Sequence, residues 1–176
     1  MPIKQPPVLG FAAFSGTGKT SLLVRLIPFL NSQGLRVGVI KYSHHDVEVD
    51  QPGKDSFKLR KAGATPMMLV SPYRRALLTE FSAPKEINLK EQLEAFPMAE
   101  LDLILVEGFR DQAFAKIELH RHILGKPLLY PNDADIIAVA SDQALPTPAH
   151  LPCLNLNDPE SIGRFIMRDF MGIAGI

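Results

Sequence analysis

The residues of this chain best suited to chemistry occupy positions 13–20, the string Ala-Phe-Ser-Gly-Thr-Gly-Lys-Thr. This string matches the G-x-x-x-x-G-K-[ST] pattern except at its first position, where alanine replaces glycine. Gly16 and Gly18 allow the backbone to curl so that its N–H groups surround an anion. Lys19 would contact the β- and γ-phosphates of a nucleoside triphosphate, and the Thr20 hydroxyl would ligate Mg²⁺.

The surrounding elements favour a phosphate-binding loop over a simple turn. Residues 8–13 are an apolar run typical of a strand buried on both faces of a parallel sheet. Residues 19–33 have helical apolar spacing, are interrupted by Pro28 and end at Gly34, and the positive end of this helix would point at the phosphates. The predicted nucleotide-binding residues are Ser15, Gly16, Thr17, Gly18, Lys19, Thr20 and Ser21.

A second apolar strand, residues 101–106, ends at Glu107-Gly108 and resembles a Walker B strand. A carboxylate at that end lies beside the phosphate loop and can hold Mg²⁺ directly or through water. Glu107 is therefore predicted as a metal and catalytic residue together with Lys19, although an acid here can also cap a following helix. Asp102 should lie at the entry of the strand, away from the chemistry.

A polar segment, residues 42–55, contains His44-His45-Asp46 and is too long for a simple connection. Two adjacent histidines without cysteines argue against a dedicated zinc site. The segment follows the second predicted strand, so we expect a loop that senses the γ-phosphate or Mg²⁺, with a solvated polar loop as the alternative.

Ser141-Asp142 follows another apolar strand, in the position where phosphate-loop proteins often contact the base. A carboxylate there can accept hydrogen bonds from guanine N1–H and its 2-amino group, which favours Asp142 as a guanine contact, but an ordinary turn fits equally well. The usual guanine motif, Asn-Lys-x-Asp, does not occur in the chain. The candidate anion contacts are Arg60, Arg74, Arg75 and Arg110.

The remaining pattern predicts an α/β fold: a mostly parallel sheet flanked by helices, of the P-loop NTPase class. Short turn residues between two strand-like runs, 67–71 and 75–80, predict an inserted β-hairpin. We also expect strands at 35–41, 116–120 and 136–140, and helices at 54–62, 88–96 and 159–170, the last with Pro159 at its first position and Asn157 or Asp158 as its cap.

Composition limits the classes of partner. The 176 residues fit one domain, residues 1–176, and 19 basic against 19 acidic residues give no field that would attract nucleic acid. The one cysteine, Cys153, is expected to be a buried hydrophobic residue and to indicate a reducing compartment. No signal peptide and no transmembrane span are expected, which predicts a cytoplasmic protein that does not bind membranes.

These segments together resemble the molybdopterin-guanine dinucleotide biosynthesis adapter (MobB) family. The resemblance rests on residues 11–20, 40–46, 50–56, 59–64, 101–109 and 137–142. The His-His-Asp and Pro-Gly-Lys-Asp-Ser segments are far more specific than the phosphate loop, and Ala13 is similar to the family's own variant of that loop. Residues after about 143 match only loosely.

The resemblance implies GTP binding with Mg²⁺, weak hydrolysis, and assistance to the separate guanylyltransferase (MobA) that attaches GMP to molybdopterin. It leaves open whether molybdopterin itself binds. It implies a catalytic or sensing role for Asp46, with His44. It also implies a homodimer in which an insertion at about 67–97, the hairpin and the following helix, packs on the other subunit.

Two other hypotheses for the function stay open. One is a small-molecule kinase or an ATP-dependent ligase of the dethiobiotin synthetase type, whose strand also ends in Glu-Gly. A kinase should have an arginine-rich lid, whereas the adjacent pair Arg74-Arg75 falls in the predicted hairpin turn. The other is a non-catalytic module that delivers nucleotide or pterin to its partner.

Overall fold

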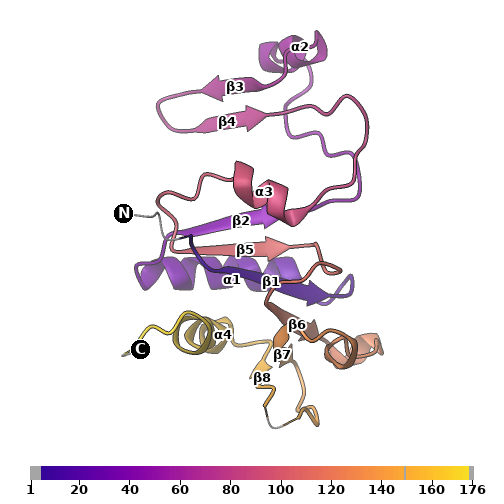
Figure 1. Ribbon diagram of the computed structural model, residues 1–176, viewed down its shortest axis with the longest axis vertical. Coiled ribbons are helices and arrows are strands. Elements are labelled where there is room, and N and C mark those ends of the chain that lie inside the picture. Colours follow the sequence, from indigo (N-terminus) through magenta and orange to yellow (C-terminus); the bar gives the residue numbers. More distant parts are fainter. Residues whose placement is uncertain (1–4, 149, 175–176) are drawn as a thin grey trace. The chain divides into compact units, whose positions relative to one another are not determined.

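The computed structural model describes residues 5–148 and 150–174 and shows strands alternating with helices (Figure 1). The strands are β1 (Val8–Ala13), β2 (Val37–Lys41), β3 (Met67–Val70), β4 (Arg75–Leu78), β5 (Leu103–Glu107), β6 (Lys116–His120), β7 (Ile136–Ser141) and β8 (Cys153–Asn155). The α-helices are α1 (Lys19–Ser32), α2 (Asp55–Lys61), α3 (Leu89–Ala95) and α4 (Pro159–Phe165), with 3₁₀ turns η1 (His122–Leu124) and η2 (Tyr130–Asn132) and a π-helical turn η3 (Ile166–Phe170).

Six strands form a sheet in the order β2-β5-β1-β6-β7-β8, and every neighbouring pair is parallel. The arrowheads of β1 and β5 accordingly point to the same side in Figure 1. The segments that follow β1, β5, β6 and β7 therefore all begin at one edge of the sheet. Ligands bind at this carboxyl edge in open α/β sheets.

Helix α1 packs on one face of the sheet because its apolar residues recur with helical spacing. Leu22, Leu23, Leu26 and Leu30 are buried in the same core as Leu9. The helix continues through Pro28, as α-helix, and loses one intrahelical hydrogen bond there. It ends as predicted at Gly34: this glycine has φ of 85°, and the following N–H, of residue 35, donates to the Leu30 carbonyl in a Schellman motif.

Helix α4 contributes to the same core, through Ile162 and Phe165. Its first turn is fixed as predicted, with Pro159 at the first helical position and the Asp158 side chain accepting a hydrogen bond from the Ser161 N–H. The expected helix to residue 170 is α-helical only as far as Phe165 and then continues as the π-helical turn η3.

Other parts of the chain cover the opposite face. A Cβ atom at Gly38 would lie 2.6 Å from Leu101 and 2.8 Å from Phe96, so the segment after α3 packs on β2. Near β7, Val139 and Leu151 are buried together and form a smaller apolar cluster. The sheet is thus covered on both faces, as expected for an α/β fold.

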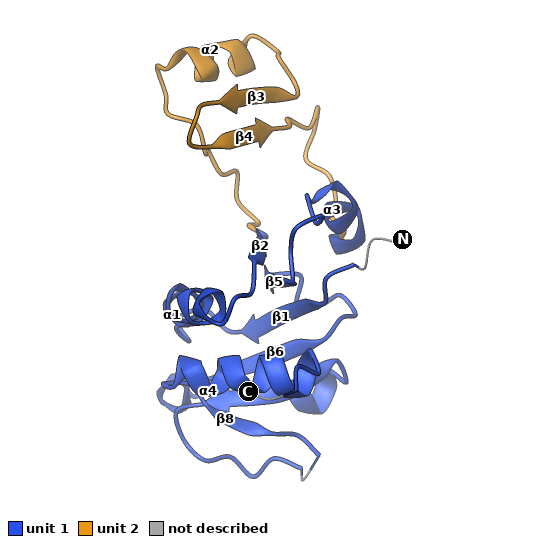
Figure 2. Cartoon of the chain, turned by 90° about the vertical axis from the view of Figure 1, so that its left-hand side faces the viewer, with its two compact units in different colours: residues 1–42, 89–176 blue, residues 43–88 orange. Residues whose placement is uncertain are grey.

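The chain divides into two compact units (Figure 2). Residues 1–42 and 89–176 form the unit with the parallel sheet, and residues 43–88 form the unit with α2 and the hairpin β3–β4. The hairpin is antiparallel, with Met68 opposite Leu77, as predicted. Of the expected insertion at 67–97, the hairpin lies in the second unit, which begins at residue 43, and α3 lies in the sheet unit.

In the C-terminal third, one strand was missed and one expectation was wrong. Strand β8 was not predicted, and it pairs with β7 through residues 139–141. Cys153, expected to be buried, is exposed and free because it lies on this edge strand. Within the described part of the chain, no helix is long and apolar enough to span a membrane.

Candidate functional site

The segment after β1 curls as a phosphate loop requires. Gly16 and Gly18 have φ of 82° and 97°, the left-handed region that glycine adopts without strain. Ala13 is the last residue of β1, and Phe109 is the only non-glycine residue with positive φ among those described. The alanine therefore occupies extended backbone, which explains why the missing first glycine does not strain the loop.

Thr17 holds the loop closed from inside. Its side chain is buried, and its hydroxyl donates a 2.7 Å hydrogen bond to the Phe14 carbonyl. Helix α1 begins directly afterwards at Lys19, with Gly18 as its N-cap. The unpaired N–H groups of a helix N-terminus, together with the helix dipole, favour an anion at this position.

Glu107 lies beside the loop, as the sequence predicted. It is the last residue of β5 and is in register with Phe11 of β1. Its carboxylate lies 3.9 Å from the Lys19 ammonium and 3.3 Å from that of Lys41 on β2. Two cations therefore flank one carboxylate at the carboxyl edge. Lys41 was not predicted as part of the site, although its place at the end of the second strand was a signal for it.

Asp102 lies at the opposite edge, also as predicted. It precedes β5, where Arg36 donates to it from both its backbone N–H and its guanidinium. These hydrogen bonds lower the pKa of the Asp102 carboxyl. The pair joins the amino ends of β2 and β5 and has no contact with the loop.

A tight turn after Glu107 fixes the direction of this carboxylate. Gly108 has φ of 104° and Phe109 has φ of 55°. The Phe109 ring stacks on Tyr42, with centroids 4.8 Å apart, and the Tyr42 N–H donates to the Glu107 carbonyl. A Cβ atom at Gly108 would lie 2.7 Å from the Tyr42 Cβ. Only glycine fits at this position.

Gly108→Ala should therefore lower the free energy of unfolding by about 2 to 4 kcal/mol, through positive-φ strain and the contact with Tyr42. Gly34→Ala is the matched control, since Gly34 has φ of 85° and open space around its Cα. The control should cost only about 1 kcal/mol. Equal losses for the two variants in urea unfolding would show that the Tyr42 contact has no effect.

An arginine that was not predicted, Arg121, joins the loop to Asp142. Its Nε donates to the Thr17 carbonyl at 3.0 Å, and its Nη1 lies 3.6 Å from Asp142 Oδ2. Asp142 Oδ1 also accepts from the His122 N–H at 2.9 Å. The loops after β1, β6 and β7 are thus connected through one guanidinium. Arg121 directly follows the predicted strand 116–120, but strand order is needed to place that strand next to β1.

Arg121→Ala should weaken nucleotide binding by about 5- to 30-fold, because loss of its hydrogen bonds frees the loop at Thr17. Arg36→Ala removes a similar arginine–aspartate pair at the opposite edge of the same sheet. We expect the control to bind nucleotide with unchanged affinity in a fluorescent-nucleotide titration. An equal loss of nucleotide affinity in the two variants would contradict the role of Arg121 in holding the loop.

A cavity of about 380 Å³ begins at Asp142. It lies where β7 and β8 end, and its volume is within the usual range of small-molecule pockets. The exposed Cys153 thiol is on β8 at this cavity. The lining residues are Ser141, Asp142, Gln143, Ala144, Leu145, Cys153, Leu154 and Asn155.

The four arginines predicted as anion contacts have different surroundings. Arg110 lies at the loop, with its guanidinium 5.7 Å from the centre of the Phe14 ring. Arg60 is buried in the second unit and pairs with Glu48 and Glu80, so its charge is used within that unit. Hydrogen bonding from Arg60 lowers the pKa of the Glu48 carboxyl to about 2. Arg74 and Arg75 are exposed on the hairpin.

His44 and Asp46 belong to the second unit, in the exposed segment before α2. Their sensing role stays a prediction. Within the same segment, Asp50 organises the start of the helix by accepting from the Gln51 N–H and the Ser56 hydroxyl.

The residues predicted for Mg²⁺ are chemically suitable. Thr20 and Glu107 offer a hydroxyl and a carboxylate, the hard oxygen ligands that Mg²⁺ prefers. Among the described residues, no group of three or more His, Cys, Asp or Glu side chains forms a metal site.

A glycine loop between a central parallel strand and a helix, with an acid at the end of the neighbouring strand, defines the P-loop class of α/β proteins. Residues 8–142 match the family model of molybdopterin guanine dinucleotide synthesis protein B (MobB). The chain belongs to this family.

Two curated relatives match most of the chain. A molybdopterin-guanine dinucleotide biosynthesis adapter protein of Escherichia coli (strain K12) is 46% identical over 162 residues, which cover 92% of this chain and 91% of the relative. An adapter protein of the same name from Haemophilus influenzae is 41% identical over 163 residues, covering 92% and 88%.

Solved structures of similar proteins have the same fold. A Bacillus subtilis MobB structure gives a TM-score of 0.70 at 21% identity and covers 92% of this chain and 97% of its own. A structure described as molybdopterin-guanine biosynthesis protein B gives 0.67 at 24% identity, with 91% and 97% coverage.

Proposed function

We propose that this protein is an adapter in molybdopterin-guanine dinucleotide biosynthesis, which binds Mg-GTP and assists the guanylyltransferase that attaches GMP to molybdopterin. The observation that supports it most is the 46% identity, over 92% of the chain, to a protein described as such an adapter. The phosphate-loop geometry supports a nucleotide site as part of that role. Hydrolysis of the bound GTP is weak.

The groups that act on the phosphates come from the loop and from the end of β5. Lys19 and the N–H groups of the loop stabilise charge on the β- and γ-phosphates. Thr20 and Glu107 would hold Mg²⁺, which would neutralise negative charge on the bound phosphates. As the phosphates bind, Lys19 moves from Glu107 to the phosphate oxygens, and Lys41 remains to pair with the carboxylate.

The guanine base occupies the cavity at the ends of β7 and β8. Asp142 has two oxygens with more than one lone pair each, so hydrogen bonds from His122 and Arg121 leave capacity for guanine N1–H and the 2-amino group. Adenine has no such pair of donors. This arrangement favours GTP over ATP.

A single-turnover assay tests the catalytic part of this proposal. Purified protein with Mg-GTP should release phosphate slowly, and addition of guanylyltransferase and molybdopterin should give more dinucleotide than the transferase alone. Asp46→Ala should slow the hydrolysis if Asp46 positions a water, and a wild-type rate would remove that role. Rapid phosphoryl transfer to a small acceptor would instead indicate a kinase.

The homodimer is also a proposal, supported by the hairpin. Three apolar side chains lie on one face of it and are more than half exposed: Met68 at 51%, Val70 at 65% and Leu77 at 58%. A contiguous exposed apolar surface of this kind marks a protein interface.

Met68→Glu should convert the dimer to monomers, because a charge would be buried without a partner in the interface. The matched control is Val24→Glu, since Val24 is 66% exposed on α1 of the sheet unit. Sedimentation velocity should show a smaller species for Met68→Glu and no change for the control. Wild-type protein that sediments as a monomer would exclude the dimer.

A further inference from the structure

Strand β6 buries three polar side chains on one of its faces. Ile117 and Leu119 pack into the main core, whereas Lys116, Glu118 and His120 point to the opposite face and are 2%, 1% and 8% exposed. Burying polar side chains costs free energy unless they are hydrogen-bonded. Each of the three is bonded to the backbone of a loop on that face.

Glu118 holds the start of η2. Its two oxygens accept from the Leu129 and Tyr130 N–H groups at 2.8 and 2.9 Å. Burial raises the pKa of the Glu118 carboxyl, while these two donors act in the opposite direction. The loop after β6 is thereby fixed at residues 129 and 130.

Lys116 and His120 fix the positions of two other residues, both cationic. Lys116 Nζ donates to the Arg110 carbonyl at 3.2 Å, and His120 Nε2 donates to the Lys126 carbonyl at 3.2 Å. A carbonyl can only accept, so Nε2 carries the proton. Arg110 and Lys126 lie in different loops, after β5 and after η1, and β6 anchors the backbone of both.

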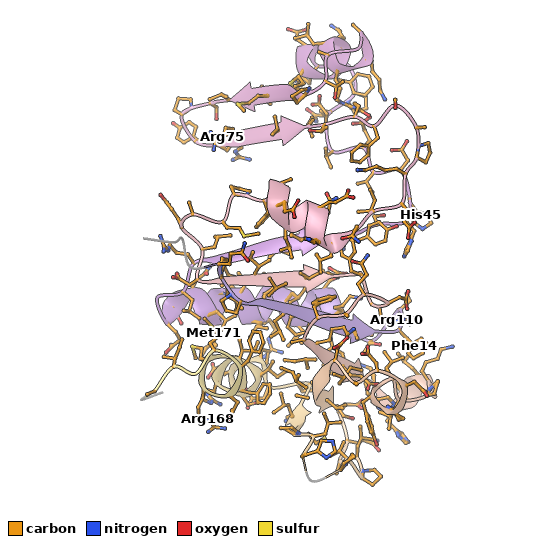
Figure 3. The ribbon with its side chains drawn as sticks, in the orientation of Figure 1. Phe14, His45, Arg75, Arg110, Arg168 and Met171 are labelled. Carbon is orange, nitrogen blue, oxygen red and sulfur yellow. The ribbon has the colours of Figure 1, made fainter. Side chains whose placement is uncertain are left out.

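Both anchored cations lie near the side chain of Phe14 (Figure 3 shows Arg110 and Phe14 next to each other). The Arg110 guanidinium lies 5.7 Å and the Lys126 ammonium 5.9 Å from the Phe14 ring centre. Aromatic rings attract cations at such distances. Phe14 occupies a variable position of the phosphate-loop pattern, so phosphate binding by the loop does not require an aromatic residue there.

These charges are available to an anion. Arg110 pairs weakly with Asp111, at 3.6 Å, and Asp111 is 91% exposed. No carboxylate of the described residues pairs with Lys126. Arg110 follows Glu107 by three residues, and Glu107 contacts Lys19 of the phosphate loop.

A cavity of about 400 Å³ adjoins Arg110 on the same face of the sheet. Lys116 forms one wall, where its ammonium pairs with Asp133 at 3.0 Å. The volume is sufficient for a small ring system, and the wall offers side-chain oxygens that accept hydrogen bonds from ring N–H groups. The lining residues that supply such oxygens are Asp111, Gln112, Asn132, Asp133 and Asp135.

We propose that a second small molecule bearing a phosphate monoester binds beside the nucleotide, with its phosphate between Arg110 and Lys126 and its ring in the adjoining cavity. This inference rests on the proposed function, since it places a small phosphorylated ligand next to the bound GTP. The cluster that binds it consists of Phe14, Arg110 and Lys126, positioned by Lys116 and His120.

The test uses phenyl phosphate as the probe. It uses Lys19→Ala protein as the background, so that binding of the probe to the phosphate loop does not dominate the measurement. Calorimetry should give similar affinities of the probe for wild-type and Lys19→Ala protein. Adding Arg110→Gln and Lys126→Met should weaken binding at least about tenfold. Both side chains reach solvent, and unchanged melting temperatures would show that the variants fold.

A second arm identifies the source of the phosphate. The affinities of guanosine 5′-(β,γ-imido)triphosphate and GDP are measured for wild-type protein and for the Arg110→Gln, Lys126→Met variant. Their ratio should not change. A selective loss of triphosphate affinity would show that the two cations serve the nucleotide's own terminal phosphate, and would overturn the proposal.

Two further outcomes would also overturn it: no probe binding to wild-type protein, or equal binding with and without the two cations. If the guanine nucleotides do not bind wild-type protein at all, the proposed function fails. The probe titration on Lys19→Ala still decides the second site in that case.

Discussion

Replacing Lys19 with alanine should weaken Mg-GTP binding about 10- to 100-fold. Charge-assisted hydrogen bonds are worth about 1.5 to 3 kcal/mol, and Lys19 is the lysine that the loop presents to the β- and γ-phosphates. Its ammonium is only partly exposed and lies next to Glu107, so the substitution also leaves that carboxylate with one cation fewer. Fluorescence titration with a labelled GTP analogue measures the loss.

Lys41→Ala provides the matched control for this experiment. Lys41 pairs with the same carboxylate but is more exposed and lies on β2 rather than in the loop. Exposed ion pairs contribute little, so the control should change affinity less than about fivefold. If Lys41→Ala lowered the GTP affinity as much as Lys19→Ala, the positive charge near Glu107, and not the loop lysine in particular, would determine binding.

Replacing Lys116 with methionine should lower the free energy of unfolding by about 2 to 4 kcal/mol. The methionine matches the aliphatic stem but removes an ammonium that donates to the Arg110 and Gln112 carbonyls and pairs with Asp133. Removing one partner of a buried ion pair leaves the other charge uncompensated. Asp133 is partly exposed, which keeps the loss below the upper values for such pairs.

Thermal unfolding should show this loss as a fall in Tm of about 5 to 15 °C. In the control, Lys58→Met, an exposed lysine loses a pair with Asp55 within α2, and stability should stay within about 0.5 kcal/mol. An unchanged Tm for Lys116→Met would contradict the anchoring role assigned to this lysine.

Much of the fold was predictable because local signals were strong. The apolar run of β1, the glycines of the loop, and the helical spacing of α1 with Gly34 after it occur within thirty residues and agree with one another. The loop lysine and Glu107 followed from the same logic, since parallel strands end at one edge. The hairpin was marked by two strand-like runs with a short turn between them.

The missed features depend on tertiary neighbours. β8 has only three residues, too few for a periodic pattern. Because this strand was missed, Cys153 was wrongly expected to be buried. Arg121 reaches the loop only because β6 lies beside β1, which sequence order does not reveal. Lys116 and His120 resemble surface residues in a short strand, and their burial follows from the loops folded over that face.

Calorimetric titration of wild-type protein with Mg-GTP and with Mg-ATP tests the central claim most directly. We expect one site per chain for GTP and a clearly weaker affinity for ATP, since adenine lacks the two donors that guanine would offer to Asp142. Equal affinities would contradict the guanine contact, and the absence of binding by both nucleotides would contradict the phosphate loop at residues 13–20 itself.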